Sequence, residues 1–564
     1  MSLADVEAEP RINIKAGEPA NSAPLHVDPA QRARRILLWL MLLGAALRIL
    51  RYLADRSLWL DEAYLANSIL TYSFKQLLTR PLMHWQAAPA GFLLLQKLAV
   101  TLFGGSEYAL RIVPLLAGLA SIPLFYGVIR RCLTPTGQVL AMGLFVLLDP
   151  LIYYAAEAKQ YGLDVTVTLA ILWAALRVRE DRGNVKRMVA LAIIGVVGIF
   201  CSHPAVFTLT GAGIVLSFDP LRIRSLRLDG RARLLPSRGL RASPGSAGAS
   251  PSHSNRDLST ERPPILGLLL VGLVWLAAFA ADYVLSLRPL MHHAGLAAYW
   301  AADYMPCEPL AATKWVGWEL YQLYAGYATM WLPLVDTAIL ATLIGFIPIW
   351  KQDRSTLALL ILPLVLTLGA ATVHAYPFGS RLVLFLVPSL VVLIGAGSAL
   401  IWESVVPRRR YIAALILLSI LLPTAARDAF YVVVPQRREE IRPVLAYIRD
   451  HKRPGDSLYA FYISKVPFHY YADRFGLSPN RMGLADMRTI IGQPGDRDPS
   501  LYRADLARLR GKGRVWVLIT HPRALGGIDE EQLFSAILDQ WGKPLDHVQA
   551  FNSSATLYDM GTGS

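Results

Sequence analysis

The sequence contains few charged residues for its length of 564. Charged side chains make up 17% of the chain and hydrophobic ones 54%, and the mean hydropathy is +0.39. Soluble domains carry about 25% charged residues, and a single soluble core stops growing near about 250–300 residues. This composition argues against a string of soluble domains and predicts that a bilayer holds the surplus apolar residues.

Cysteine and acidic residues are also scarce. Three cysteines exclude a disulfide scaffold and a metal cluster ligated by cysteine. Only 41 Asp and Glu stand against 56 Lys and Arg, which gives a formal net charge of +15. In a membrane protein an excess of Lys and Arg is first of all an indicator of topology, because basic residues are enriched in cytoplasmic loops.

Apolar runs separated by basic clusters predict a polytopic α-helical membrane protein of about 11 transmembrane helices. The expected spans are 36–54, 109–129, 137–154, 163–179, 187–202, 205–219, 264–286, 327–350, 355–373, 381–402 and 411–428. Two of them are shorter than the ~20 residues that a span needs, which leaves the total open by one or two. Arginines before the first span place the N-terminus in the cytoplasm. An odd number of spans then leaves the C-terminus on the extracytoplasmic side. The membrane expected to hold the protein is the inner or plasma membrane of the cell.

Polar segments divide the chain further. The expected units are a disordered cytoplasmic tail at 1–35, a transmembrane catalytic domain at 36–428 with a basic cytoplasmic loop at 219–264, and an extracytoplasmic soluble α/β domain at 429–564. Within the last unit, 458–463 and 514–520 have the pattern of strands and 438–449 that of a helix.

The first outside loop holds a short apolar stretch at 92–103. About a dozen residues are too few to cross a bilayer, so the stretch predicts an interfacial helix. Just past the first expected span, Asp61 and Glu62 are adjacent beside Trp59. A carboxylate at the bilayer edge is partly desolvated, which raises its basicity and suits a general base. The alternative is an acidic first turn of an interfacial helix, favoured by the helix dipole.

The second outside loop is also acidic. If it is helical, Glu157, Tyr161 and Asp164 lie on one face. Ionisable groups at a span boundary are functional candidates. The alternative is an interfacial tyrosine belt in which Lys159 extends to the headgroups.

The third segment of interest is the short loop from His374 to Arg381. Arg381 suits a phosphate near headgroup level, and the alternative is a lipid anchor without a specific ligand. His203 lies between two spans, where a lone histidine is more often a packing residue than a catalyst.

The motif Leu58-Trp-x-Asp-Glu-Ala63 resembles the first-loop signature of polyprenyl-phosphate-dependent glycosyltransferases of the GT-C superfamily, family 39-like. This group includes the protein O-mannosyltransferases and the lipid A aminoarabinose transferase. Segments 88–111 and 154–161 resemble the next conserved stretches of these enzymes, and the likeness extends over roughly 36–400.

The resemblance implies an inverting transfer of a sugar from a polyprenyl-phosphate carrier to an extracytoplasmic lipid, glycan or protein. It makes Asp61 the general base and Glu62 its neighbour, which either orients Asp61 or shares the contact with the acceptor. Glu157 would be the acid of the second loop that orients the sugar or the acceptor. The donor phosphate would contact Lys159, Tyr161 and Arg381, and the candidate substrate contacts are Trp59, His84, His203 and His374. Relatives often carry Lys-Pro-Pro or His-Pro-Pro where this chain has Ala87-Ala88-Pro89, so that phosphate contact is missing here or has moved to His84.

No cofactor is required by the sequence. A divalent metal could bind Asp61 and Glu62, but these are few oxygen ligands for one, and a lipid monophosphate leaving group carries less charge than a nucleotide diphosphate. The expected partners are the donor lipid, the acceptor and the bilayer, not nucleic acid.

Two alternatives to a transferase remain. One is a transporter or flippase of a lipid-linked sugar that uses the same carboxylates as a proton relay, and the other is a polymerase or ligase with a diphosphate carrier. Transporters often show internal repeats and charges near the middle of spans. This chain shows no repeat and carries its carboxylates in outer loops, which favours the transferase.

Overall fold

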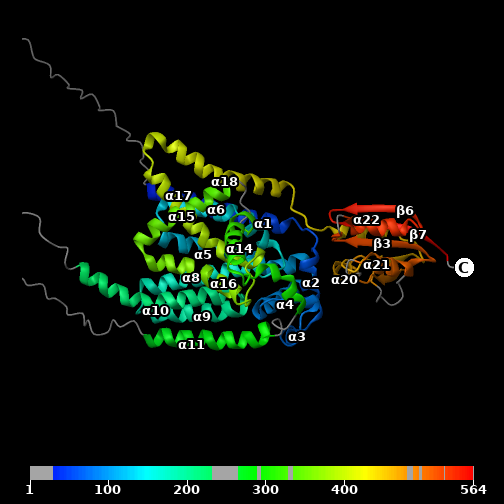
Figure 1. Cartoon of the computed structure of the whole chain (residues 1–564), viewed down its shortest axis with the longest axis horizontal. Coiled ribbons are helices and arrows are strands. Elements are labelled where there is room, and N and C mark those ends of the chain that lie inside the picture. Colours follow the sequence, from blue (N-terminus) through cyan, green and yellow to red (C-terminus); the bar gives the residue numbers. More distant parts are fainter. Residues whose placement is uncertain are drawn as a thin grey trace, which may run out of the picture.

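The computed structural model describes residues 29–230, 265–288, 294–327, 334–478, 487–494, 498–525 and 528–562. A body of helices forms most of the molecule, and a small domain built on a sheet lies against one end of it (Figure 1). The first helix begins at Pro29, so the last residues of the predicted tail 1–35 are helical. The rest of that tail, and residues 231–264 of the predicted basic loop, lie outside the described residues.

Each predicted span falls on helical structure where its residues are described, whereas 264 and 328–333 of the spans 264–286 and 327–350 lie outside the described residues. The helices are α1 (Pro29–Leu53), α5 (Glu107–Cys132), α6 (Pro135–Leu147) with α7 (Asp149–Tyr153), α8 (Tyr161–Glu180), α9 (Val185–Cys201), α10 (Ala205–Gly230), α11 (Ile265–Asp282), α15 (Leu334–Gln352), α16 (Arg354–Thr372), α17 (Val387–Ser404) and α18 (Arg410–Val433). Within the described residues, six helices are long and apolar enough to cross a membrane, or seven if a pair bent by 58° at α6–α7 is one span. The chain is therefore a multi-pass membrane protein, and the total of eleven spans stays a prediction.

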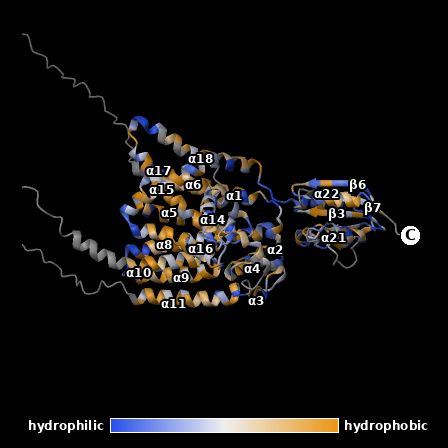
Figure 2. Ribbon diagram, viewed as in Figure 1, coloured by the Kyte–Doolittle hydropathy of each residue, from blue (hydrophilic) through white to orange (hydrophobic). Residues whose placement is uncertain are grey.

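The outer surface of the helical body is apolar. Trp39 on α1 is 71% exposed and Leu266 on α11 is 69% exposed, and hydrophobic residues cover the helices while the C-terminal sheet is mixed (Figure 2). A soluble protein rarely exposes such a contiguous apolar surface. These side chains instead match the hydrocarbon of a bilayer.

Helix α17 lies at the centre of the body and packs closely against α15. A Cβ on Gly345 of α15 would overlap the carbonyl oxygen of Leu393, and one on Gly397 of α17 would overlap that of Ala341. Small residues at such a crossing let two backbones approach closely in a membrane. The 3₁₀ segment η7 (Ser380–Leu386) leads directly into α17, so this packing fixes the start of η7, where Arg381 lies.

The first loop folds into short helices at the end of the body that faces the sheet (Figure 1). These are α2 (Leu60–Thr71), α3 (Phe74–Thr79), η1 (Met83–Trp85) and α4 (Ala90–Phe103), and α4 matches the short helix predicted at 92–103. Lys97 of α4 donates to the carbonyl of Ile69 at the end of α2 over 2.9 Å. This bond satisfies a carbonyl that the helix end leaves free.

A second set of short elements precedes α15. It comprises η4 (Tyr283–Leu287), α13 (Ala294–Tyr299), η5 (Ala301–Asp303), α14 (Pro309–Gln322) and η6 (Leu323–Tyr327). We call these elements the aromatic segment, because they contain Tyr299, Trp300, Tyr304, Trp315, Trp318, Tyr321 and Tyr324. The backbone N–H of Phe378 donates to the carbonyl of Asp303 over 2.8 Å, which ties the segment to the loop before Arg381.

The C-terminal domain is the α/β fold expected from the sequence. Its elements are α19 (Ile441–His451), β1 (Ser457–Ala460), α20 (Lys465–Tyr471), β2 (Arg488–Ile491), α21 (Pro499–Leu506), β3 (Lys512–Thr520), β4 (Ala524–Leu525), β5 (Ile528–Asp529), α22 (Glu530–Leu538), β6 (Lys543–Ala550) and β7 (Ser553–Thr562). The sheet order is β2-β1-β3-β7-β6. Strand β1 pairs in parallel with β2 and β3, whereas β7 pairs antiparallel with β3 and β6.

The domain is packed onto the first loop, not tethered loosely to it. One hydrophobic cluster contains Leu58 and Leu65 of the first loop, Phe92 of α4, and Ile441 and Tyr471 of the C-terminal domain. Burial of such side chains contributes about 25 cal/mol per Å². The two parts of the chain therefore share a core at the end of the helical body.

Candidate functional site

A cavity of about 760 Å³ lies where the first loop, α8, the aromatic segment, the loop before η7 and the C-terminal domain meet. Its tyrosine and tryptophan lining consists of Trp59, Tyr64, Tyr161, Tyr299, Trp300, Tyr304 and Tyr376. A concave site of this size, mostly apolar with a few convergent polar groups, is typical of a ligand pocket.

Asp61 stands in the first turn of α2 and lines this cavity. One carboxylate oxygen lies 2.9 Å from Nζ of Lys159, and the other lies 3.0 Å from a guanidinium nitrogen of Arg381. Burial alone would raise the pKa of Asp61, but the two cations together hold that pKa below its ordinary value. Asp61 is therefore an ionised carboxylate shared between two cations.

Glu62 follows Asp61 but does not line the cavity. It is fully buried and forms a bidentate ion pair with Arg111 of α5, at 2.9 and 2.7 Å. Its carboxylate also accepts the backbone N–H of Ala158 over 2.8 Å. Burial opposes ionisation of Glu62, yet Arg111 lowers its pKa below the ordinary value. Neighbours in a helix point about 100° apart, so the predicted substrate contact of Glu62 gives way to a role in joining the first and second loops.

Glu157 also lies outside the cavity lining. Its backbone is extended, and α8 begins only at Tyr161, so the helical face predicted for Glu157, Tyr161 and Asp164 does not form. Tyr161 and Asp164 line the cavity, whereas Glu157 is fully buried behind it. Burial and the nearby Glu62 carboxylate raise the pKa of Glu157, against the opposing effect of Arg438 and Arg56.

Lys159 points into the site and not to the headgroups. It is 3% exposed and, besides Asp61, donates to the side-chain oxygen of Gln86 over 2.5 Å. Burial lowers the pKa of Lys159, although the Asp61 carboxylate opposes this effect. The alternative prediction from the sequence was that Lys159 extends to the lipid headgroups, and the ion pair between Lys159 and Asp61 excludes that orientation. Gln86 was not among the predicted site residues.

Arg381 is held by aromatic rings as well as by Asp61. Its guanidinium carbon lies 5.4 Å from the ring centre of Tyr161 and 5.9 Å from that of Trp59. The guanidinium carbon of Arg438 lies 4.5 Å from the ring centre of Trp59 and 4.9 Å from that of Tyr153. Cations over aromatic faces are attracted by the ring quadrupole, so Trp59 contacts two arginines.

The three predicted histidines all line the cavity, at separate places on its wall. The His84 ring lies 4.9 Å from that of Tyr64, and the His374 ring lies 5.0 Å from that of Tyr304. Nδ1 of His203 is 3.8 Å from a carboxylate oxygen of Asp282. None of the three is within ion-pair distance of Asp61 in the described part of the chain.

The C-terminal domain adds two cavity residues that sequence reasoning missed. His521 and Arg523 follow directly after β3 and line the cavity. The His521 ring is 6.5 Å from Trp59, and its backbone has a φ of 52°, the left-handed region that few side chains other than glycine adopt. No local sequence pattern predicts that His521 or Arg523 belongs to the site, because their position at the cavity depends on how the whole C-terminal domain packs against the helical body.

Across the residues that the structure describes, no three His, Cys, Asp or Glu side chains gather closely enough to hold a metal ion. The two oxygens of Asp61 already face cations.

Comparisons with known proteins connect part of this site to one family. The sequence model of the dolichyl-phosphate-mannose-protein mannosyltransferase family matches residues 87–230, a segment that includes Lys159 and Tyr161 but neither Asp61 nor Arg381. The match confirms the resemblance predicted from the motifs. No curated protein gives a significant match.

Solved structures give distant matches. ArnT from Cupriavidus metallidurans bound to undecaprenyl phosphate is 12% identical, with a TM-score of 0.46 over 92% of this chain and 98% of that one. AglB from Archaeoglobus fulgidus in complex with an inhibitory peptide and a dolichol-phosphate is 11% identical, with a TM-score of 0.48 over 93% of this chain and 74% of that one.

Proposed function

We propose that this chain, a member of the GT-C superfamily of membrane glycosyltransferases, transfers a sugar from a polyprenyl-phosphate carrier to a hydroxyl group of an extracytoplasmic acceptor. The observation that carries the proposal is the position of Asp61 on the cavity wall, within 3.0 Å of both Lys159 and Arg381. A base and two cations are what this transfer needs, and they come together at one place in a pocket lined by aromatic rings.

The reaction is written as a single displacement with inversion. Asp61 takes the proton of the acceptor hydroxyl, whose oxygen forms a bond to the anomeric carbon of the sugar. The bond from that carbon to the phosphate oxygen breaks on the opposite side, and its electron pair leaves with the lipid phosphate. Lys159 and Arg381 neutralise the charge that develops there, a contribution that preorganised cations make without rearranging solvent.

Binding of the donor would also activate the base. While Lys159 and Arg381 hold the Asp61 carboxylate, its pKa stays below the ordinary value. A phosphate that draws the two cations toward itself withdraws part of this stabilisation, and the basicity of Asp61 rises. Asp61 therefore becomes an effective base when the carrier lipid occupies the pocket.

Removal of either cation is expected to weaken donor binding. Lys159→Met and Arg381→Gln each remove one charge from the phosphate, and we expect the KM for a polyprenyl-phosphate mannose donor to rise about 10-fold or more, since hydrogen bonds to charged groups contribute about 1.5–3 kcal/mol. The measurement is transfer of labelled sugar in detergent, paired with binding of undecaprenyl phosphate. Lys351→Met, at the far end of α15, is the matched control and should leave both values unchanged.

Two outcomes would contradict the proposed function. If the wild-type chain consumes none of a panel of polyprenyl-phosphate sugars, the transferase is the wrong activity. If liposomes containing the chain move labelled lipid-linked sugar across the bilayer without transfer, the flippase alternative replaces it.

The pH profiles of kcat/KM and kcat should differ, because the first reports the free enzyme and the second the donor complex. In the free enzyme Asp61 remains ionised at unusually low pH, because its pKa is lowered. The acidic limb of kcat/KM, which reports the free enzyme, is therefore expected at lower pH than the acidic limb of kcat, which reports the complex in which the cations face phosphate. If the acidic limbs of kcat/KM and kcat fall at the same pH, donor binding does not raise the pKa of Asp61.

The same proposal fixes the orientation. The first loop, the aromatic segment and the domain at 429–564 all border the cavity or pack beside it, so they lie on one side of the membrane, which we assign to the extracytoplasmic side. The acceptor then enters between the aromatic segment and the C-terminal domain, where His521 and Arg523 form part of the wall.

A further inference from the structure

The helix that carries Asp61 has no cap of its own. Its N-cap residue is Trp59, and no side chain of the segment itself bonds the first backbone N–H groups of α2. The first four N–H groups of a helix have no partner within it, and burial without a partner costs free energy. Something else must satisfy them, because Leu58 and Leu60 are both buried.

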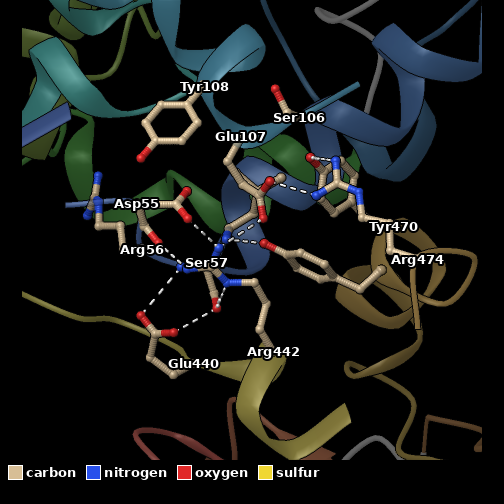
Figure 3. Close-up of polar contacts among 12 residues, drawn as sticks. Asp55, Arg56, Ser57, Ser106, Glu107, Tyr108, Glu440, Arg442, Tyr470 and Arg474 are labelled. Atoms are coloured by element: carbon tan, nitrogen blue, oxygen red, sulfur yellow. Dashed lines mark hydrogen bonds and ion pairs between the residues drawn. The ribbon is translucent and has the colours of Figure 1, made fainter. Parts of the chain in front are cut away.

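One of these N–H groups, that of Leu60, bonds the C-terminal domain, where Glu439 accepts it over 3.1 Å. The residues just before α2 are bonded to the same domain. The hydroxyl of Tyr471 accepts the N–H of Leu58 over 2.8 Å, and Glu440 accepts from the hydroxyl of Ser57 over 2.7 Å (Figure 3). The cap of α2 is therefore supplied by a segment almost 380 residues away.

Arginines hold the same segment as well. Arg111 donates to the carbonyl of Arg56 over 2.8 Å and to that of Ser57 over 3.3 Å. Arg442 of α19 forms an ion pair with Asp55 at 2.9 Å and donates to the hydroxyl of Ser57, as Figure 3 shows. Residues 55–60 are thus bonded through N–H groups to carboxyl and hydroxyl oxygens and through carbonyls to arginines.

A second ion pair ties the domain to the start of α5. Arg474 lies 2.6 Å from a carboxylate oxygen of Glu107, and the Tyr470 hydroxyl donates to the carbonyl of Gly105 over 2.8 Å (Figure 3). The domain is therefore bonded to the helical body at two places, at residues 55–60 and at the start of α5.

We propose that Glu439 is a positioning residue for the transfer reaction, which fixes the first turn of α2 and hence the Asp61 carboxylate between Lys159 and Arg381. This inference rests on the proposed function, since it assigns Glu439 an effect on the step that Asp61 performs. Glu439 does not line the cavity and touches no substrate. It acts through the backbone of Leu60, one residue before Asp61.

Glu439 also connects two walls of the pocket. Its carboxylate lies 3.9 Å from Nδ1 of His521, which lines the cavity from the C-terminal domain. Burial raises the pKa of Glu439 to about 8, although the Leu60 N–H and the Thr520 hydroxyl lower it. A neutral amide that keeps an acceptor oxygen should therefore replace this carboxyl well.

The test compares Glu439→Ala with Glu439→Gln. Alanine removes the acceptor of the Leu60 N–H, and we expect kcat to fall about 10- to 100-fold with little change in the donor KM, because displacement of a catalytic group by about 1 Å can cost about 100-fold. Glutamine keeps the acceptor oxygen and should restore kcat to within about 3-fold of wild type, a cost of about 0.65 kcal/mol or less.

The matched control is Asp505→Ala. Asp505 is a buried carboxylate of the same domain that also accepts a backbone N–H, that of Gln493, over 3.0 Å. Its other bonds go to Tyr459 and Arg508 and not to α2. Its removal should lower the thermal unfolding midpoint as much as Glu439→Ala does and leave kcat near wild type. An equal loss of kcat in both variants, or a Gln variant that is folded yet as slow as Ala, would overturn the positioning role.

A readout without substrate separates this inference from the proposed function. Hydrogen exchange of the amides at 58–64 should be faster in Glu439→Ala than in wild type and unchanged in Asp505→Ala. If the wild-type chain transfers no sugar but hydrogen exchange at 58–64 is faster in Glu439→Ala, the proposed function is wrong, whereas the role of Glu439 in fixing the first turn of α2 is supported. If transfer is observed but exchange and kcat do not respond, only the positioning role fails.

Discussion

Replacement of Asp61 by Asn is expected to lower kcat for sugar transfer by about 10²–10⁴-fold, the contribution usual for a positioned general base. The amide cannot accept the proton of the acceptor hydroxyl. It also no longer competes with phosphate for Lys159 and Arg381, which lie 2.9 and 3.0 Å from the carboxylate in the wild-type chain. Affinity for undecaprenyl phosphate should therefore be kept or increased while turnover is lost, and both are measured on the same detergent-solubilised protein.

This opposite change in kcat and affinity distinguishes a base from a structural residue. A misfolded variant would lose both. Asp336→Asn, an exposed carboxylate at the start of α15, serves as the control for the change from acid to amide and should leave both values unchanged. Turnover of Asp61→Asn within about threefold of wild type would remove Asp61 as the base, whatever its affinity for the carrier.

The largest effect on stability is expected at the pair of Glu62 and Arg111. Arg111→Met leaves a fully buried carboxylate without its cation, and breaking a buried pair from one side costs about 3–5 kcal/mol. It also frees the carbonyls of Arg56 and Ser57 that Arg111 binds. We expect Arg111→Met to lower the thermal unfolding midpoint in detergent more than Glu62→Gln, which removes the charge but keeps one acceptor oxygen, the counterpart of the one that binds Nε of Arg111 and the Ala158 N–H.

An exposed pair provides the comparison. Arg449 and Asp450 form an ion pair at 2.7 Å on the surface of the C-terminal domain, and such pairs contribute little to stability. Arg449→Met should not change the unfolding midpoint. If Arg111→Met also leaves the unfolding midpoint unchanged, the first and second loops are held together by packing and not by the buried ion pair.

Element type was predictable from the sequence because it depends on local spacing. Long apolar runs gave helices, and the short run at 92–103 gave α4. The alternating and apolar stretches near 458–463 and 514–520 gave β1 and β3. Each of these patterns repeats with the period of the element that it forms.

The prediction for the second loop was wrong in one respect, for a physical reason. The spacing of Glu157, Tyr161 and Asp164 fits one face of a helix, but the chain leaves the helical region at Glu157 and re-enters it at Tyr161. The N–H of Ala158 bonds Glu62 instead of continuing a helix. A tertiary contact thus overrides the local period, and it takes Glu157 out of the cavity lining.

By itself the sequence determined a multi-pass membrane protein with an α/β domain at its C-terminal end, a first-loop motif centred on Asp61, and Lys159 and Arg381 as candidate phosphate contacts. The tertiary structure alone decided which of these groups meet. It brought Arg381 to Asp61 across 320 positions, turned Glu62 away to Arg111, and added Glu439, His521 and Arg523 from the C-terminal domain. Charge and hydropathy patterns act over a few residues, whereas the site is built by the packing of elements distant in the chain.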